Sequence, residues 1–141
     1  METGDQATLL VRGPKRSFFV KKNKILIVED EESLLRLESI LLTSKGYDVI
    51  GAGNGQQALD AVLAHRPDLV LLDIMLPEID GFEVCRRIKS NPETQGTPVI
   101  MVTAKKTGDD MARGEAVGAD WYITKPFKSA MVIETIQRFL P

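Results

Sequence analysis

The sequence predicts an α/β fold: a parallel five-stranded sheet with helices packed against both of its faces. Short apolar runs alternate with longer amphipathic segments five times along the 141-residue chain. Alternation of this kind builds βαβ units, whose strands lie parallel to one another. The central runs are continuously apolar, which is typical of strands that helices cover on both sides.

The pattern begins with KILIVE (24–29), a short apolar strand that ends in an acidic residue. A helix is predicted over 32–46. Its apolar residues Leu34, Leu37 and Leu41 recur at the spacing of one helical face, and a glycine closes the segment.

The next two units follow the same alternation. YDVIGA (47–52) is the second strand, and GQQALDAVLAHR (55–66) is a helix that a proline then stops. DLVLLD (68–73) is the third strand. FEVCRRIKS (82–90) is the third helix, with Cys85 expected on its inner face as part of the core.

The last part of the chain completes the set. PVIMVTA (98–104) and WYIT (121–124) are the fourth and fifth strands. TGDDMARGEAVG (107–118) is a weaker helix, because it contains two internal glycines. KSAMVIETIQRFL (128–140) is clearly amphipathic, since its apolar residues recur every three or four positions.

Composition excludes several classes of protein. With 43% apolar residues the chain should be globular, and it has no apolar run of the roughly eighteen residues that span a membrane. A single cysteine excludes a disulfide framework. The start of the chain lacks the order of a signal peptide, so we expect a cytoplasmic protein.

Charge is unevenly distributed along the chain. Residues 1–24 carry six Lys/Arg and two acidic residues (net +4), and the other 117 carry twelve and eighteen (net −6). An acidic domain is a poor candidate for direct nucleic-acid binding. Residues 1–23 stand outside the strand–helix pattern, and we expect a flexible extension or a segment added for expression. A basic docking tail, or an added strand through Phe18–Val20, is the alternative.

Charged and polar residues occur where the predicted strands end. In chain order they are Glu29 and Asp30, Asp73, Thr103 and Lys125. Because the carboxyl ends of parallel strands meet at one edge of the sheet, where ligands bind in such folds, we expect these side chains to converge.

Three neighbouring carboxylates repel one another, and their simplest use is to hold one hard divalent cation. Mg²⁺ accepts a few carboxylate oxygens and keeps positions for a phosphoryl oxygen. Lys125 would add a positive charge against that group, and Thr103 a hydrogen-bond donor. Asp73 is the best candidate for a nucleophile that forms an aspartyl phosphate, because it ends the most apolar central strand. The carbonyl of Met75 is a further candidate metal ligand.

Four motifs, in order and suitably spaced, resemble the receiver domain of two-component response regulators. They are VEDE (28–31), LLDIMLPEIDG (71–81), VIMVTA (99–104) and GADWYITKPF (118–127). The resemblance covers residues 24–140. It implies a receiver domain over 24–141, with a flavodoxin-like three-layer sandwich and the strand order 2-1-3-4-5.

The resemblance assigns roles to the acidic residues. It implies that Asp73 accepts the phosphoryl group and that Glu29 and Asp30 bind Mg²⁺, with the Met75 carbonyl completing the protein ligands. Glu29 stands where many members of the family have Asp. Glutamate is a familiar variant there and should still serve.

The resemblance also assigns the switch residues. Lys125 is expected to contact the phosphoryl group, and Thr103 is the implied switch hydroxyl. Tyr122 is the implied switch aromatic, which turns inward when Thr103 moves. Trp121 precedes it, at a position where a polar or small residue is common.

By the same resemblance, the phosphoryl group comes from a sensor histidine kinase or a phosphotransfer protein. Phosphorylation is expected to change the surface of the fourth helix, fifth strand and fifth helix, and so to regulate a partner or an output domain. A phosphorylation-dependent homodimer through that surface is a family-based alternative. The chain would be a phosphoacceptor and not an enzyme, apart from catalysing its own phosphorylation and dephosphorylation.

Three other functions fit parts of the sequence. A haloacid-dehalogenase-type phosphohydrolase also forms an aspartyl phosphate, but Met75 replaces its second Asp. GAGNGQ (51–56) resembles a dinucleotide-binding turn, although Gln56 replaces the third glycine. The intact site residues disfavour a degenerate receiver that serves as a constitutive interaction module. His65, the only histidine, is expected on the surface, which argues against a kinase or phosphotransfer protein.

Overall fold

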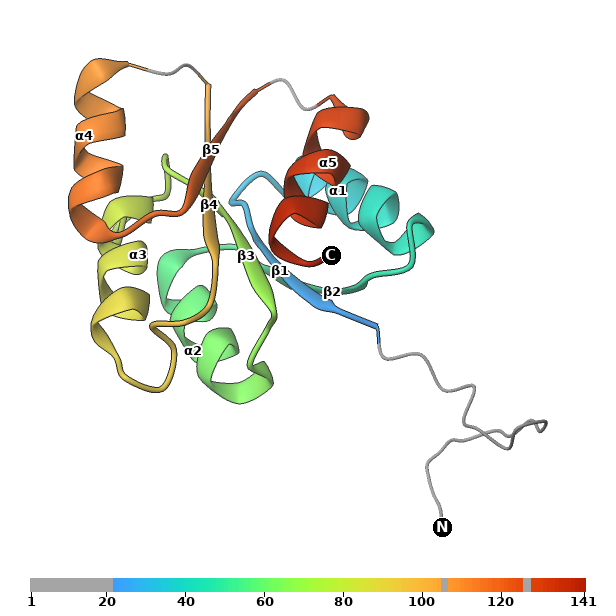
Figure 1. Ribbon diagram of the computed structural model, residues 1–141, viewed down its shortest axis with the longest axis horizontal. Helices are drawn as coiled ribbons and strands as arrows, with labels where there is room; N and C mark the ends of the chain where they lie inside the picture. Colours follow the sequence, from blue (N-terminus) through green and yellow to red (C-terminus); the bar gives the residue numbers. More distant parts are fainter. Residues whose placement is uncertain (1–21, 105–106, 126–127) are drawn as a thin grey trace, which may run out of the picture.

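The computed structural model describes residues 22–104, 107–125 and 128–141, and it confirms the predicted fold (Figure 1). One parallel sheet of five strands has the order β2-β1-β3-β4-β5. The predicted extension over 1–23 and its alternative strand through Phe18–Val20 fall almost entirely outside the described residues, so both stay predictions.

All ten predicted elements are present, and their ends lie within two residues of those expected. The strands are β1 (Lys24–Val28), β2 (Asp48–Ala52), β3 (Leu69–Asp73), β4 (Val99–Thr103) and β5 (Trp121–Thr124). The helices are α1 (Glu32–Ser44), α2 (Gly55–His65), α3 (Gly81–Ser90), α4 (Gly108–Val117) and α5 (Ser129–Phe139).

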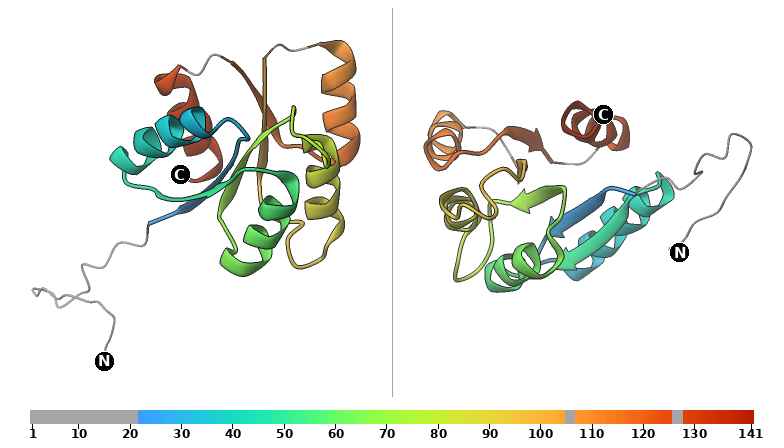
Figure 2. Two further views of the ribbon diagram at one scale, coloured as in Figure 1. Left: turned by 180° about the vertical axis from the view of Figure 1, so that it is seen from behind. Right: turned by 60° about the horizontal axis from the view of Figure 1, so that its bottom comes forward.

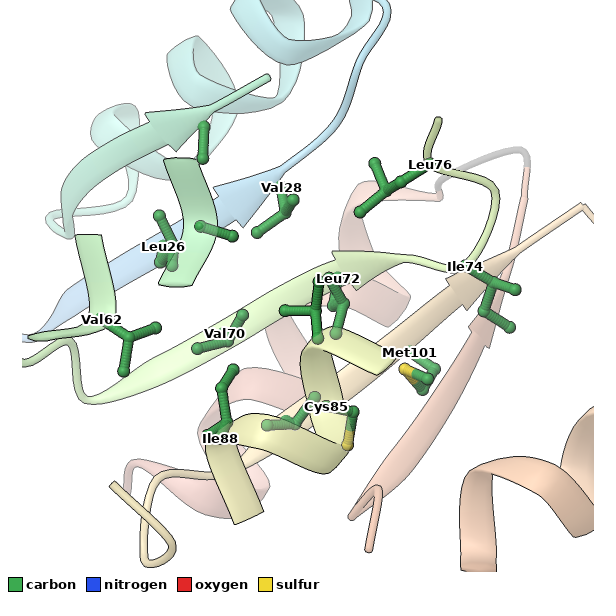
Figure 3. Close-up of a cluster of buried hydrophobic side chains, with 14 of the residues drawn as sticks. Leu26, Val28, Val62, Val70, Leu72, Ile74, Leu76, Cys85, Ile88 and Met101 are labelled. Atoms are coloured by element: carbon green, nitrogen blue, oxygen red, sulfur yellow. The ribbon is translucent and has the colours of Figure 1, made fainter. Parts of the chain in front are cut away.

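The sheet is the middle of three layers, with α2, α3 and α4 on one face and α1 and α5 on the other (Figures 1 and 2). β3 and β4 are buried at every position, as their continuous apolar sequence predicts. Alternate strand residues enter two separate cores. Leu26 and Val70 face α2 and α3, where Cys85 points into the cluster as predicted (Figure 3). Ile25 and Leu71 belong to the core under α1 and α5.

The strand register brings the carboxyl ends of four strands to one level. Glu29 directly follows β1 and lies level with Asp73 at the end of β3. Asp73 pairs with Val102, so Thr103 comes one residue further on. Lys125 directly follows the β5 residue that pairs with Thr103. The convergence of the predicted site residues is therefore a consequence of the register.

Helix α1 lies where its sequence predicts, but its buried face differs from its leucine stripe. Leu37, in the middle of that stripe, is 64% exposed, whereas Glu38 and Leu42 are the buried residues of the helix. The helix therefore carries an acidic side chain into the molecule and leaves a large apolar one in solvent.

Gly81 begins α3 at a point with no space for a side chain. Its N–H donates to the Ile74 carbonyl at 3.0 Å, and a Cβ added here would collide with the Asp73 carbonyl oxygen and lie 2.8 Å from the Ile74 Cα. These are backbone atoms of the turn after β3, so they cannot move aside cheaply. The glycine thereby allows α3 to start directly against Asp73.

We expect Gly81→Ala to lower the free energy of unfolding by about 1–3 kcal/mol, as overpacking against backbone does. Gly96→Ala is the matched control, because nothing lies within 4 Å of a Cβ at that position. Urea denaturation measures both variants. Equal stability of the two would contradict the role given to Gly81.

Candidate functional site

The three acidic residues predicted to converge do so. Glu29, Asp30 and Asp73 each offer a carboxylate oxygen, and these oxygens lie within 4.8 Å of one another. Glu29 and Asp73 are buried, whereas Asp30 is exposed. This set of hard oxygen donors at the ends of the adjacent strands β1 and β3 suits a small divalent cation such as Mg²⁺.

Lys125 connects the two buried acids. Its Nζ donates to Glu29 Oε1 at 2.9 Å and to Asp73 Oδ2 at 3.2 Å. Burial alone would lower the pKa of Lys125, but the hydrogen bond to Glu29 and the charges of Asp73 and Glu29 outweigh it, so this pKa is raised. The lysine therefore remains a cation, and it reaches both acids from the far side of β4.

Backbone groups hold the other oxygens of these carboxylates. The N–H of Met75 donates to Asp73 Oδ1 at 3.0 Å, and the N–H of Glu31 donates to Glu29 Oε2 at 3.1 Å. Each buried acid is thus fixed between Lys125 and the turn that follows its own strand. Met75 lies on the turn beside Asp73, and the use of its carbonyl as a metal ligand stays a prediction.

Thr103 completes the convergent group at the end of β4. Its side chain is buried, and its carbonyl accepts a hydrogen bond of 2.7 Å from the Lys125 N–H. The register puts it one residue beyond the partner of Asp73. This is the position at which a hydroxyl can serve the same ligand as Asp73 and Lys125; its role as a switch stays a prediction.

Tyr122 packs against α4. Its hydroxyl donates to the carbonyl of Asp110 at 2.9 Å and lies 3.3 Å from that of Met111. Burial raises the pKa of this phenol. A Cβ at Gly114 would collide with the Tyr122 hydroxyl, so this internal glycine of α4 makes room for the ring. From the sequence, Gly114 was predicted only to weaken the helix.

Glu38 is a site residue that the sequence reasoning missed. It is 5% exposed, and its Oε2 has no hydrogen-bond partner among the described residues. Burial, reinforced by the charge of Glu29, raises its pKa from 4.5 to about 8, although Lys125 opposes the shift. The sequence does indicate that Glu38 is buried, because it lies three residues after Leu35 and four before Leu42 on one helical face.

Two other residues are found where the sequence places them. His65 is exposed at the end of α2. Cys85 is fully buried, and burial raises the pKa of its thiol to about 11, so it is not a reactive nucleophile.

Nearby side chains already accept hydrogen bonds from backbone N–H groups at the turn over residues 51–56. Asn54 caps α2 by accepting the N–H of Gln57 at 2.8 Å, and the Gln57 side chain accepts the N–H of Gly53 at 2.8 Å. A dinucleotide-binding turn instead presents such N–H groups to a pyrophosphate.

A comparison with protein families decides between the receiver domain, the phosphohydrolase and the dinucleotide-binding fold. Residues 25–137 match the family model described as the response regulator receiver domain. The chain belongs to this family. It is therefore a signalling phosphoacceptor domain, and the phosphohydrolase and dinucleotide-binding alternatives are set aside.

Curated relatives of this receiver domain are longer proteins. The DNA-binding response regulator MtrA of Mycobacterium tuberculosis is 42% identical over 116 residues, which are 82% of this chain and 50% of that protein. The response regulator ArlR of Staphylococcus aureus is 44% identical over 117 residues, or 83% and 52% of the two chains. The chain thus spans about half the length of the curated relatives it matches.

Solved receiver structures share the fold. The chemotaxis response regulator CheY4 of Vibrio cholerae matches with a TM-score of 0.80 and 30% identity, over 84% of this chain and 99% of that one. The receiver domain of sensor histidine kinase PA1611 from Pseudomonas aeruginosa matches with a TM-score of 0.79 and 31% identity, over 85% and 98%. That structure has a magnesium ion coordinated in the active site cleft.

Within residues 22–104, 107–125 and 128–141, every helix is too short or too polar to cross a bilayer.

We expect Gly114→Ala to displace the Tyr122 ring from α4, because the added methyl occupies the place of the hydroxyl. Loss of this partly buried position should return the phenol pKa toward its ordinary value, which NMR titration of the two tyrosines measures. Gly108→Ala is the control in the same helix, since a Cβ there meets nothing within 4 Å. An unchanged Tyr122 titration in Gly114→Ala would refute this account.

Glu38 should make the folded domain less stable as pH rises. Below pH 4.5 its carboxyl is protonated in both states, and between 4.5 and about 8 only the folded state keeps the proton. Raising the pH through this window therefore favours the unfolded chain. The upper limit of the loss is roughly 5 kcal/mol, at about 1.4 kcal/mol per unit of pKa.

Glu38→Leu should remove this part of the pH dependence and stabilise the domain above pH 8. Urea denaturation at several pH values, in a metal chelator, measures the difference from the wild type. Glu134→Leu on the exposed surface of α5 is the control. Parallel pH profiles for the wild type and Glu38→Leu would show that Glu38 ionises normally.

Proposed function

We propose that this receiver domain is a switch in which Asp73 accepts a phosphoryl group. The observation that carries the proposal is the buried cluster in which Asp73 Oδ2 lies 3.2 Å from the ammonium group of Lys125, beside Glu29. Asp73 ends a fully buried central strand and is held by the turn behind it. A carboxylate fixed beside a cation is a positioned nucleophile.

The donor set supports Mg²⁺ as the cofactor. Glu29, Asp30 and Asp73 would hold the ion, together with the carbonyl of Met75. When bound, it neutralises charge on the carboxylates and on the phosphoryl oxygens. Lys125 alone compensates for one of the three negative charges, so the cluster is suited to further cationic charge.

The proposed transfer is an in-line displacement. A carboxylate oxygen of Asp73 attacks the phosphorus of a phosphohistidine, and the imidazole leaves with the electron pair of the N–P bond. Lys125 then contacts the new phosphoryl oxygens, and the Thr103 hydroxyl donates to them. The same residues support hydrolysis of the acyl phosphate, so we propose that the domain catalyses its own phosphorylation and dephosphorylation and no other reaction.

The expected change at the surface depends on the elements that carry Thr103 and Tyr122. Movement of Thr103 toward the phosphoryl group shifts the end of β4, which leads to α4. Tyr122 is bonded to that helix through Asp110, so the surface of α4, β5 and α5 changes with it. A partner protein, an output domain or a second copy of the chain would recognise this surface.

The proposed phosphodonor is a sensor histidine kinase or a phosphotransfer protein. One relative is named as a DNA-binding response regulator. The described residues of this chain carry twelve Lys/Arg against eighteen acidic residues, a net charge of −6. We therefore propose that the receiver itself does not bind nucleic acid.

Incubation with Mg²⁺ and acetyl phosphate should give one phosphoryl adduct by intact-mass spectrometry. Asp73→Asn should lose it, because the amide is not a nucleophile, and a chelator should suppress it in the wild type. Asp60→Asn, on the exposed surface of α2, is the matched control and should be modified normally. Undiminished phosphorylation of Asp73→Asn would overturn the assignment of the acceptor.

A further inference from the structure

An apolar groove runs along α1 and reaches Ser129 at the start of α5. It has a volume of about 820 Å³, and its lining includes Leu34, Leu37, Ile40 and Leu41 of α1 and, at one end, Lys125. Leu37 and Ile40 remain 64% and 61% exposed in the described part of the chain. Two large apolar side chains one helical turn apart thus form an uncovered stripe beside a groove.

Glu38 also lines this groove and adds a polar requirement. It is more than nine-tenths buried, and its Oε2 has no hydrogen-bond partner among the described residues. A buried carboxyl without a partner is costly, and a donor entering from the groove would satisfy it. The groove therefore fits a segment that combines apolar side chains with hydrogen-bond donors.

The beginning of the described chain lies next to one end of the groove. The carbonyl of Asn23 accepts the N–H of Asp48 at 3.0 Å, and Tyr47 is bonded back to Leu42 in the last turn of α1. Ser44, two residues further along that turn, lines the groove. The described chain therefore begins beside this end of the groove.

The length of the segment also agrees with the length of the groove. Ten residues of α1, from Ser44 to Leu34, rise about 15 Å at 1.5 Å per residue. An extended segment covers that distance in about five residues at 3.3 Å each. Residues 15–20 are long enough to follow the groove from end to end.

The sequence of that segment, KRSFFV, matches the groove. Phe18, Phe19 and Val20 are apolar, and Lys15 and Arg16 are cationic. Residues 6–21 contain four Lys/Arg and no acidic residue, whereas the described residues have a net charge of −6. We propose that residues 15–20 fold back into this groove along α1, with the aromatic side chains on Leu37 and Ile40 and the N–H donors of Lys15 and Arg16 toward Glu38.

Thiol labelling tests this proposal on the full chain. Leu37→Cys introduces a reporter in the groove, and Leu63→Cys, on α2 and 49% exposed, is the matched reporter outside it. Cys85 is fully buried and stays silent. A maleimide should label position 37 at least tenfold more slowly than in the same variant carrying Phe18→Ser and Phe19→Ser. Position 63 should react equally in both backgrounds.

Each other outcome contradicts the proposal. Equal labelling of position 37 in the two backgrounds would show that the segment does not cover the groove. Protection that grows with protein concentration would assign the groove to a second copy of the chain. Ile40→Cys is a second reporter if Leu37→Cys perturbs the helix. Labelling needs no phosphoryl donor, so its outcome is independent of whether Asp73 accepts a phosphoryl group.

Discussion

The carboxylates of Glu29, Asp30 and Asp73 lie close enough to repel one another, and the rest of the site depends on how the fold compensates for that repulsion. Lys125 reaches from the end of β5 to contact Glu29 and Asp73, and its N–H is bonded to the carbonyl of Thr103. One residue thus connects the ends of β1, β3, β4 and β5. Since these strands leave the sheet at one level, the contacts need no long loops, and the site has the rigidity of the sheet.

The same lysine links the site to α1. Glu38 adds a fourth carboxyl, and the charges of Glu29 and Asp73 help burial to raise its pKa, while Lys125 lowers it. When Glu38 is neutral, the ammonium group of Lys125 remains with Glu29 and Asp73, the two acids that the lysine contacts. An ionised Glu38 would compete for that group and add negative charge to a crowded region. By the proposed function, a phosphoryl group on Asp73 would change this balance again, and the protonation of Glu38 would then respond to the state of Asp73 through Lys125.

The convergence of the site could be predicted from the sequence because it depends on the backbone alone. Parallel strands of equal length end at one level, so the positions of Asp73 and Thr103 were readable from where their apolar runs stop. The orientation of side chains on the helices was harder to predict from the sequence. The leucine stripe coincides only in part with the buried face of α1, since Leu41 packs against the core but Leu37 is exposed; helical spacing alone cannot choose between two neighbouring stripes. The role of Gly114 could not be read at all, since it depends on a tyrosine from a strand eight residues later.

The packing of Tyr122 also sets the cost of the proposed switch. Its hydroxyl has two backbone carbonyls of α4 within hydrogen-bonding distance, and net contributions of about 1 kcal/mol per hydrogen bond are typical. Turning the ring inward would give up these contacts and leave a gap above Gly114, where no side chain can fill it. α4 itself begins at one glycine and contains another, which lowers its intrinsic helix propensity. Loss of contacts of this size would cost on the order of 1 kcal/mol each, which charge-assisted hydrogen bonds to a phosphoryl group on Asp73 would be strong enough to offset.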